Sequence, residues 1–285
     1  MKKSILLFVI LIAGICSQTQ AQKQGQELID SLQAELKNYN VSKIELRRPM
    51  YDNGDTLKVN ILYELGWELM GAGDNAKARQ YADDAMAVSE KIDFKKGTAK
   101  AYDLIGIIYQ AQGNYTDALK NHFAALKIDE KIGDKKNIAG SYTNIGLIYF
   151  DQGNYTDALK NHFDALKIEE EIGAKIDIGN SYMNIGLVYE QQGDYPDALK
   201  NFFASLKIFE EIGSKRGIAG SYNNIGNVYG LQGNYPDALN NQLAALKMEK
   251  ETGDKNGMAA TTLILEKYIP GSKNIQKQKN TQMMD

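Results

Sequence analysis

The chain has 285 residues and a formal net charge of −3, with 24% charged residues, 43% hydrophobic residues and 4 Pro. This composition excludes a disordered chain and is typical of an ordered, mostly helical protein. Lys and Glu alternate along the sequence instead of clustering by sign, so the basic face that nucleic-acid-binding proteins need is missing and no nucleic-acid partner is expected.

Residues 1–21 have the pattern of an export signal. Lys2 and Lys3 precede an apolar run over residues 5–15, and Thr19-Gln20-Ala21 forms a small-x-Ala cleavage site. The run is too short for a comfortable bilayer span, and no second apolar run of about 18 residues follows it, so no stable membrane span is expected after cleavage. We therefore predict an exported protein that is periplasmic or secreted.

Cys16 is the single cysteine of the chain. Bacterial lipoprotein signals resemble Leu-Ala-Gly-Cys, with a small residue directly before the cysteine. Bulky Ile15 stands in that place here, so ordinary cleavage is favoured over lipid anchoring through Cys16. Cleavage after Ala21 removes the thiol, which leaves no disulfide, thiol nucleophile or thiolate metal site in the mature protein.

Residues 22–58 are expected to form an N-terminal capping helix and a loop. An apolar stripe with i, i+4, i+8 spacing predicts one amphipathic helix over residues 24–38. The stripe consists of Leu28, Leu32 and Leu36. The pattern breaks from Asn40 to Thr56, and Asp52-Asn53-Gly54-Asp55 has turn chemistry, which predicts a loop at the entrance to the following region.

From residue 59 the sequence repeats with a period of 40 residues. The recurring residues are Gly106, Gly146, Gly186 and Gly226, then Gly113, Gly153, Gly193 and Gly233, and then Ala118, Ala158, Ala198 and Ala238. A fixed period in this range indicates a solenoid, in which stacked units bury one continuous core. We predict five units over residues 59–256, a C-terminal capping helix over 257–270 and a flexible tail over 271–285. The units are residues 59–98, 99–138, 139–178, 179–218 and 219–256.

Each unit contains signals for two helices joined by a tight turn. The first helix ends at a glycine such as Gly153, where a left-handed conformation costs least. The second begins with an N-cap residue such as Asn154, with Asp157 three residues later as a variant of the capping box. It runs about 18 residues, for example from Tyr155 to Ile172, before another glycine ends it. The predicted fold is therefore all-α, an α-solenoid of antiparallel helix pairs.

The residues of the third unit resemble the tetratricopeptide repeat family when position 1 is placed at Ala139. The matching large, small and aromatic residues are Tyr142, Ile145, Gly146, Tyr149, Gly153, Tyr155, Ala158 and Ala165. The resemblance implies a superhelix. The usual repeat has about 34 residues and a Pro near its end, whereas the units here are longer and lack that Pro. This long form is similar to the arrays of kinesin light chains and of exported bacterial sensor proteins.

The resemblance also implies that the first helices line a concave groove through repeat positions 2, 5, 6, 9 and 12. The asparagines at these positions are Asn144, Asn184 and Asn224 at position 6, with Asn180, Asn223 and Asn227. In long-repeat relatives, asparagines at position 6 hold a peptide main chain, because an amide offers both donors and an acceptor. The apolar residues predicted to take ligand side chains are Trp67, Phe150, Met183 and Leu187. The alternative is that the asparagines only hydrate the face or bond to neighbouring helices, and that the apolar residues pack in the core.

No constellation for catalysis is present in the sequence. His122 and His162 hold the same position in adjacent units and are expected to pack in place of the usual large aromatic residue instead of binding a metal. There is no supported Ser-His-Asp order, phosphate loop, GxGxxG or HExxH. We therefore expect no catalytic residue, cofactor or metal.

The predicted function is that of an exported, non-catalytic scaffold that binds a protein or extended peptide along its concave face. The alternative is a sensory module of an envelope signalling system, of the histidine kinase or cyclase type, with the output domain missing or on another chain. Nothing in the sequence bears on the oligomeric state.

Overall fold

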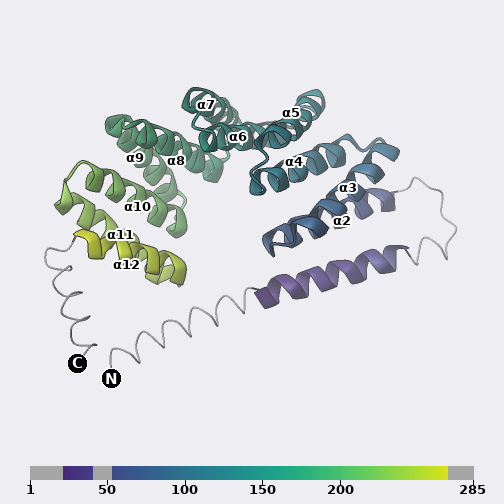
Figure 1. Cartoon of the computed structure of the whole chain (residues 1–285), viewed down its shortest axis with the longest axis horizontal. Helices are drawn as coiled ribbons and strands as arrows, with labels where there is room; N and C mark the ends of the chain where they lie inside the picture. The colour runs from purple at the N-terminus through teal and green to yellow at the C-terminus, as the bar shows by residue number, and fades with distance from the viewer. Residues whose placement is uncertain (1–21, 41–52, 269–285) are drawn as a thin grey trace, which may run out of the picture. The chain divides into compact units, whose positions relative to one another are not determined.

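The computed structural model describes residues 22–40 and 53–268 (Figure 1). In these two ranges the chain is helical apart from short turns, and it contains no strand. A helix over residues 22–40 comes first. The helices that follow are α2 (Asn53–Gly71), α3 (Asn75–Lys91), α4 (Lys95–Ala111), α5 (Tyr115–Ile132), α6 (Lys135–Asp151), α7 (Tyr155–Ile172), α8 (Lys175–Gln192), α9 (Tyr195–Glu211), α10 (Lys215–Leu231), α11 (Tyr235–Thr252) and α12 (Lys255–Tyr268). From α2 to α11 each even-numbered helix and the next odd-numbered helix form one repeat, which confirms the all-α solenoid of helix pairs.

A left-handed glycine followed by an N-cap residue makes the turn inside a pair. In the second repeat Gly113 has a φ of 73°. Its N–H donates to the carbonyl of Gln110 at 2.8 Å, and the N–H of Asn114 donates to the carbonyl of Tyr109 at 2.9 Å. The Asn114 side chain accepts from the N–H of Asp117 at 3.3 Å and donates to the Asp117 carboxylate at 2.7 Å. The amide therefore caps α5 and also holds an acid at its positive end, as the sequence predicts.

The turn before α11 departs from this pattern. The side chain of Asn234 donates to the Asp237 carboxylate at 2.7 Å but accepts from no backbone N–H of α11. Asp93 stands where later repeats have a glycine such as Gly133, and among the described residues it is the one non-glycine with a positive φ, 55°. A side chain in that conformation costs roughly 1 kcal/mol, so backbone strain is concentrated in this link between the first two repeats.

Small residues let the two helices of a repeat approach closely. A Cβ added at Gly186 on α8 would lie 2.6 Å from the ring of Phe202 on α9. A Cβ added at Gly106 on α4 would lie 2.7 Å from the ring of His122 on α5. The recurring glycines are therefore explained by packing, because a ring or long side chain of the second helix fills the space beside them.

The helices fall into two compact units, one up to Asn161 and one from His162. Each unit has its own apolar core. Fully buried residues of unit 1 include Leu65, Leu104, Ile105 and Ile108. Those of unit 2 include Phe202, Ile225 and Val228.

The N-terminal helix buries a different stripe from the predicted one. Ile29 is 2% exposed and packs with Leu32 and Leu36 against the core of unit 1, whereas Leu28 is 45% exposed. The buried line follows i, i+3, i+7, which keeps to the helical period of 3.6 residues better than i, i+4, i+8 does. The amphipathic helix is thus confirmed, but the placement of Leu28 on its buried face is wrong.

Helix α2 begins at Asn53, inside the loop that the sequence predicts up to Thr56. Asn and Asp favour helix starts as much as turns, because both can satisfy free backbone N–H groups. Asp55, in the first turn, is buried and accepts a hydrogen bond from the Tyr39 hydroxyl at 2.7 Å, which fixes this start.

The predicted export signal and the predicted tail over 271–285 lie outside the described residues. Within the described ranges, no helix combines the length and the apolar character needed to cross a bilayer.

Candidate functional site

The predicted binding residues lie on the first helices of the repeats, which are α2, α4 and α6 in unit 1 and α8 and α10 in unit 2. One stripe of each helix is buried, as Ile185 and Val188 are on α8, and the next stripe is half-exposed, as Asn184 and Leu187 are. We call this half-exposed stripe, at repeat positions 2, 5, 6, 9 and 12, the first-helix surface. Each unit carries its own part of it.

In unit 2, Asn184 on α8 and Asn224 on α10 hold the same position in successive repeats and are both half-exposed. Neither side chain makes a hydrogen bond to any residue that the structure describes, and the same is true of exposed Asn180 on α8. Each amide keeps an acceptor and two N–H donors. These three predicted residues therefore have hydrogen-bonding capacity that the fold leaves unused.

Asn223 and Asn227 on α10 are instead tied to neighbouring helices of unit 2. The Asn223 amide donates to the buried Glu249 carboxylate at 2.9 Å, and its oxygen lies 3.1 Å from the Thr261 hydroxyl. Gln242 donates to the Asn223 backbone carbonyl and to the Asn227 side-chain oxygen, both at 3.1 Å. For these two residues the contacts match the alternative of bonding to neighbouring helices.

In unit 1, Asn144 joins a hydrogen-bonded group that sequence reasoning missed. Asp103 Oδ1 lies 2.7 Å from Nδ1 of the buried His122 and accepts from the Asn144 amide at 3.1 Å. The carboxylate thus links α4, α5 and α6. No short motif marks this group, because 19 residues separate Asp103 from His122 and 41 separate it from Asn144.

The apolar candidates of unit 1 include one exposed aromatic pair. Trp67 is 41% exposed and stacks on Tyr63 with ring centroids 6.5 Å apart. The Lys100 ammonium lies 5.1 Å from the centroid of the Tyr63 ring, and burial, aided by nearby carboxylates, raises the pKa of Tyr63 to about 12. Phe150 is half-buried, 6.0 Å from the ring of Tyr155. Trp67 is therefore the aromatic residue of this surface that is most open to a partner.

The apolar candidates of unit 2 share their surface between core and solvent. Met183 and Leu187 are half-buried and pack against the core cluster that contains Phe202. The Met183 methyl group also covers Gly220 on the next first helix, 3.4 Å from where a Cβ would stand. Glu190 lies on the same stripe of α8, and burial raises the pKa of its carboxyl. A ligand here would meet amides and aliphatic side chains bordered by this acid.

The two histidines lie where a large side chain fills the core. His122 and His162 are at most 1% exposed, at the position that Phe202 holds in the fourth repeat. Burial lowers the pKa of His162 to about 4, and its Nδ1 has no hydrogen-bond partner. Within residues 22–40 and 53–268, no three His, Cys, Asp or Glu side chains gather into a possible metal site.

Comparison with solved structures finds proteins of similar architecture. BtubC from P. vanneervenii has a TM-score of 0.68 and 17% identity, covering 80% of this chain and 92% of its own. The putative kinesin light chain repeats of Podosopora anserina have a TM-score of 0.57 and 14% identity, covering 68% and 96%. A Rap protein complexed with competence and sporulation factor has a TM-score of 0.58 and 15% identity, covering 87% and 72%. At these identities the likeness concerns the fold alone.

Comparison of the sequence identifies the repeat itself. No curated protein matches the chain significantly. The tetratricopeptide repeat profile matches residues 58–131, 137–211 and 177–251, which together make up most of the chain. These spans contain α3, α4 and α7 to α10 completely, and most of α2, α5, α6 and α11. The chain therefore belongs to the tetratricopeptide repeat family.

Proposed function

We propose that this protein is an exported, non-catalytic scaffold that binds a protein or an extended peptide on its first-helix surfaces. The observation that carries the proposal is the pair Asn184 and Asn224, half-exposed amides at one position of successive repeats with no hydrogen bond within the described chain. Polar residues with no partner in the fold have little reason to recur in register unless something outside the chain uses them.

The chemistry of this pair suits a main chain. Each amide can donate to a peptide carbonyl and accept from a peptide N–H, which contributes about 0.5 to 1.5 kcal/mol net per bond. Asn180 adds a third amide on α8, and Leu187 offers an apolar contact beside it. Micromolar affinity needs about −8 kcal/mol, so the asparagines would set the register of the bound segment while apolar contacts supply most of the affinity.

The solved structures support this proposal at the level of the fold. One structure of similar architecture is a Rap protein complexed with competence and sporulation factor, so this type of array can hold a ligand. The export part of the proposal is supported by residues 1–21, with two lysines, an apolar run and a small-x-Ala site.

The test compares partner capture by wild type and by the double variant Asn184→Ala, Asn224→Ala. Proteins of the cell envelope are passed over immobilised chain and the retained fraction is measured. The double variant should lose capture, while its melting temperature stays within about 2 °C because neither amide has a hydrogen-bond partner among the described residues. Asn240→Ala, an exposed asparagine on second helix α11, is the matched control and should capture normally. Equal capture by wild type and the double variant would refute the proposal.

The second candidate is a sensory module of an envelope signalling system. Its supporting observation is the 40-residue repeat, which resembles the arrays of exported sensor proteins. The same capture distinguishes the two, since a membrane histidine kinase or nucleotide cyclase as the retained protein would favour the sensory function.

A further inference from the structure

A row of apolar side chains lies on the second helices of the repeats. The same position holds Phe123, Phe163, Phe203 and Leu243 in four successive repeats. Each of these side chains is between 45% and 49% exposed. We call the three members in unit 2, Phe163 on α7, Phe203 on α9 and Leu243 on α11, the outer row.

The outer row occupies the most solvent-facing line of its helices. Helix α9 packs against α8 and α10, and the side turned away from them carries the exposed residues Lys200, Phe203, Lys207 and Glu210. The neighbours of Phe203 on this line are all charged. An aromatic ring on such a line leaves nearly half of its surface in water, which is unfavourable unless a partner covers it.

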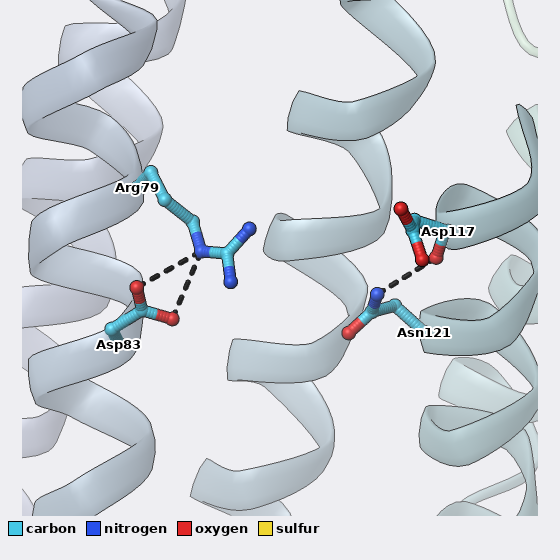
Figure 2. A network of polar contacts seen from close by, with 4 residues as sticks. All are labelled: Arg79, Asp83, Asp117 and Asn121. Carbon is cyan, nitrogen blue, oxygen red and sulfur yellow. Dashed lines mark hydrogen bonds and ion pairs between the residues drawn. The ribbon is translucent and has the colours of Figure 1, made fainter. Parts of the chain in front are cut away.

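The fold itself does not require an apolar residue at this position. In the first repeat it is held by Asp83 on α3, which accepts from Nε of Arg79 with both carboxylate oxygens at 2.9 Å. Figure 2 shows this pair one turn apart on the helix surface. Because a charged residue is accepted there, the apolar residues of the later repeats have no necessary role in the core.

Lysines flank the outer row on both sides. Lys167, Lys207 and Lys247 follow its members by four residues, and Lys200 precedes Phe203 by three. All four are exposed, and none forms an ion pair with a residue that the structure describes. With a rise of about 1.5 Å per residue, the flanking charges stand about 4.5 Å and 6 Å from the apolar row. On α9 the next acid towards the C-terminus, Glu210, stands about 10 Å from Phe203, whereas on α7 the half-exposed Asp164 directly follows Phe163. The result is an apolar band with positive edges, about 10 Å wide.

We propose that the outer row binds an amphipathic helix of a partner protein whose apolar stripe is flanked by Asp and Glu. An α-helix with its side chains is about 10 to 12 Å across, so one helix laid over the row reaches the lysines on both sides and stops short of Glu210. Charge complementarity fixes the partner as acidic. This surface is separate from the first-helix surface, which lies on other helices.

Two other occupants fit the charges less well. An anionic bilayer is much wider than the band and would meet the glutamates at positions 170 and 210 along with the lysines. A second copy of this chain, laid with row against row, would place lysines opposite lysines in both the parallel and the antiparallel arrangement. Like charges placed in this way oppose association.

The test uses the full chain and three probes. The first is a synthetic helical peptide with a leucine stripe flanked by Glu, the second is the same peptide with Lys in place of Glu, and the third is a phosphatidylglycerol vesicle. Wild type should bind the Glu-flanked peptide in preference to the Lys-flanked one. Phe203→Asp, which copies Asp83, should keep the melting temperature and weaken binding about tenfold or more. Lys207→Glu with Lys247→Glu should reverse the preference between the two peptides.

Three outcomes would overturn the proposal. The first is equal affinity of wild type for both peptides, and the second is unchanged affinity in Phe203→Asp. The third is that wild type binds neither peptide but binds the vesicle, and that Phe203→Asp abolishes this vesicle binding, which would assign the outer row to a membrane. If Phe203→Asp fails to fold, the lysine variant decides alone. Asn184→Ala with Asn224→Ala should leave peptide binding intact, so failure at the outer row and failure at the first-helix surface are distinguishable.

Discussion

Asp129, near the end of α5, gives a pH-dependent test of the fold. It is 3% exposed, and its Oδ1 has no hydrogen-bond partner. Burial raises the pKa of its carboxyl from 3.8 to about 6, with repulsion from Asp134 and Asp103 adding to the shift and Asn137 opposing it. The change Asp129→Asn keeps the shape of the side chain and removes the charge.

The sign and size of the change in the free energy of unfolding follow from the linkage between proton binding and folding. Because the pKa is higher in the folded state, the folded protein holds this proton more tightly than the unfolded chain does. Below about pH 4 the carboxyl of Asp129 is protonated in both states, and it does not destabilise the folded state. The destabilisation grows as the pH rises and is complete above about pH 6, where roughly two pKa units correspond to about 3 kcal/mol. Asp129→Asn should therefore raise the free energy of unfolding at pH 8 by about 1 to 3 kcal/mol, the lower value applying if the new N–H stays unpaired.

The assay is urea unfolding followed by far-ultraviolet circular dichroism across pH 4 to 8. The difference between Asp129→Asn and wild type should be near zero at the acid end and should increase through the interval between the two pKa values. Glu130→Gln, one residue further on and exposed, is the control and should change stability little at any pH. A difference that does not depend on pH, or a variant less stable than wild type at pH 8, would refute the reasoning.

Further substitutions test backbone strain, close packing and the asparagines. Asp93→Gly should raise the free energy of unfolding by about 1 kcal/mol, because glycine adopts a positive φ without strain. A lower free energy of unfolding than that of wild type, measured by urea denaturation, would contradict this. Gly186→Ala should lower the free energy of unfolding by about 1 to 3 kcal/mol, since its Cβ would lie 2.6 Å from a ring. Gly140→Ala, in an open part of α6, should raise the free energy of unfolding by about 0.5 to 1 kcal/mol. If the melting temperatures of the two glycine variants changed in the same direction, the packing argument would be contradicted. Asn223→Ala should lower the free energy of unfolding by roughly 1 to 3 kcal/mol, because the buried Glu249 carboxylate loses one of its two donors. Asn184→Ala should change it by less than about 0.5 kcal/mol, so equal losses would refute the assignment.

The sequence predicts the structure well where the physical cause lies within a few residues. Gly113 and Asn114 were sufficient to predict the end of α4 and the start of α5, because the conformation and the capping bonds involve only adjacent turns. The prediction of a helix from Tyr155 to Ile172 is confirmed to the residue. Prediction is weaker where helical phase decides the outcome, as with Ile29 taking the buried place expected for Leu28.

The sequence places the candidate residues on the first helices of the repeats, but it does not distinguish the asparagines that bond within the fold from those that do not. Asn184 and Asn223 are the same residue type on neighbouring first helices, both half-exposed. One is unused by the fold and the other donates to Glu249, which lies 26 residues away. The difference depends on what packs beneath each amide, and a pattern of exposed positions does not contain that information.

One buried position near the end of the second helices shows how packing decides the surface chemistry. In the first repeat it holds Ser89, whose hydroxyl donates to a backbone carbonyl of its own helix, and in the fourth it holds Phe209, whose ring packs against glycines. In the fifth it holds Glu249, a carboxylate that needs donors because it is 3% exposed. Asn223 and the Thr261 hydroxyl supply them at 2.9 and 2.8 Å. In the fifth repeat the buried acid thus draws Asn223 away from the first-helix surface, so whether this amide is left for a partner depends on the residue buried beneath it.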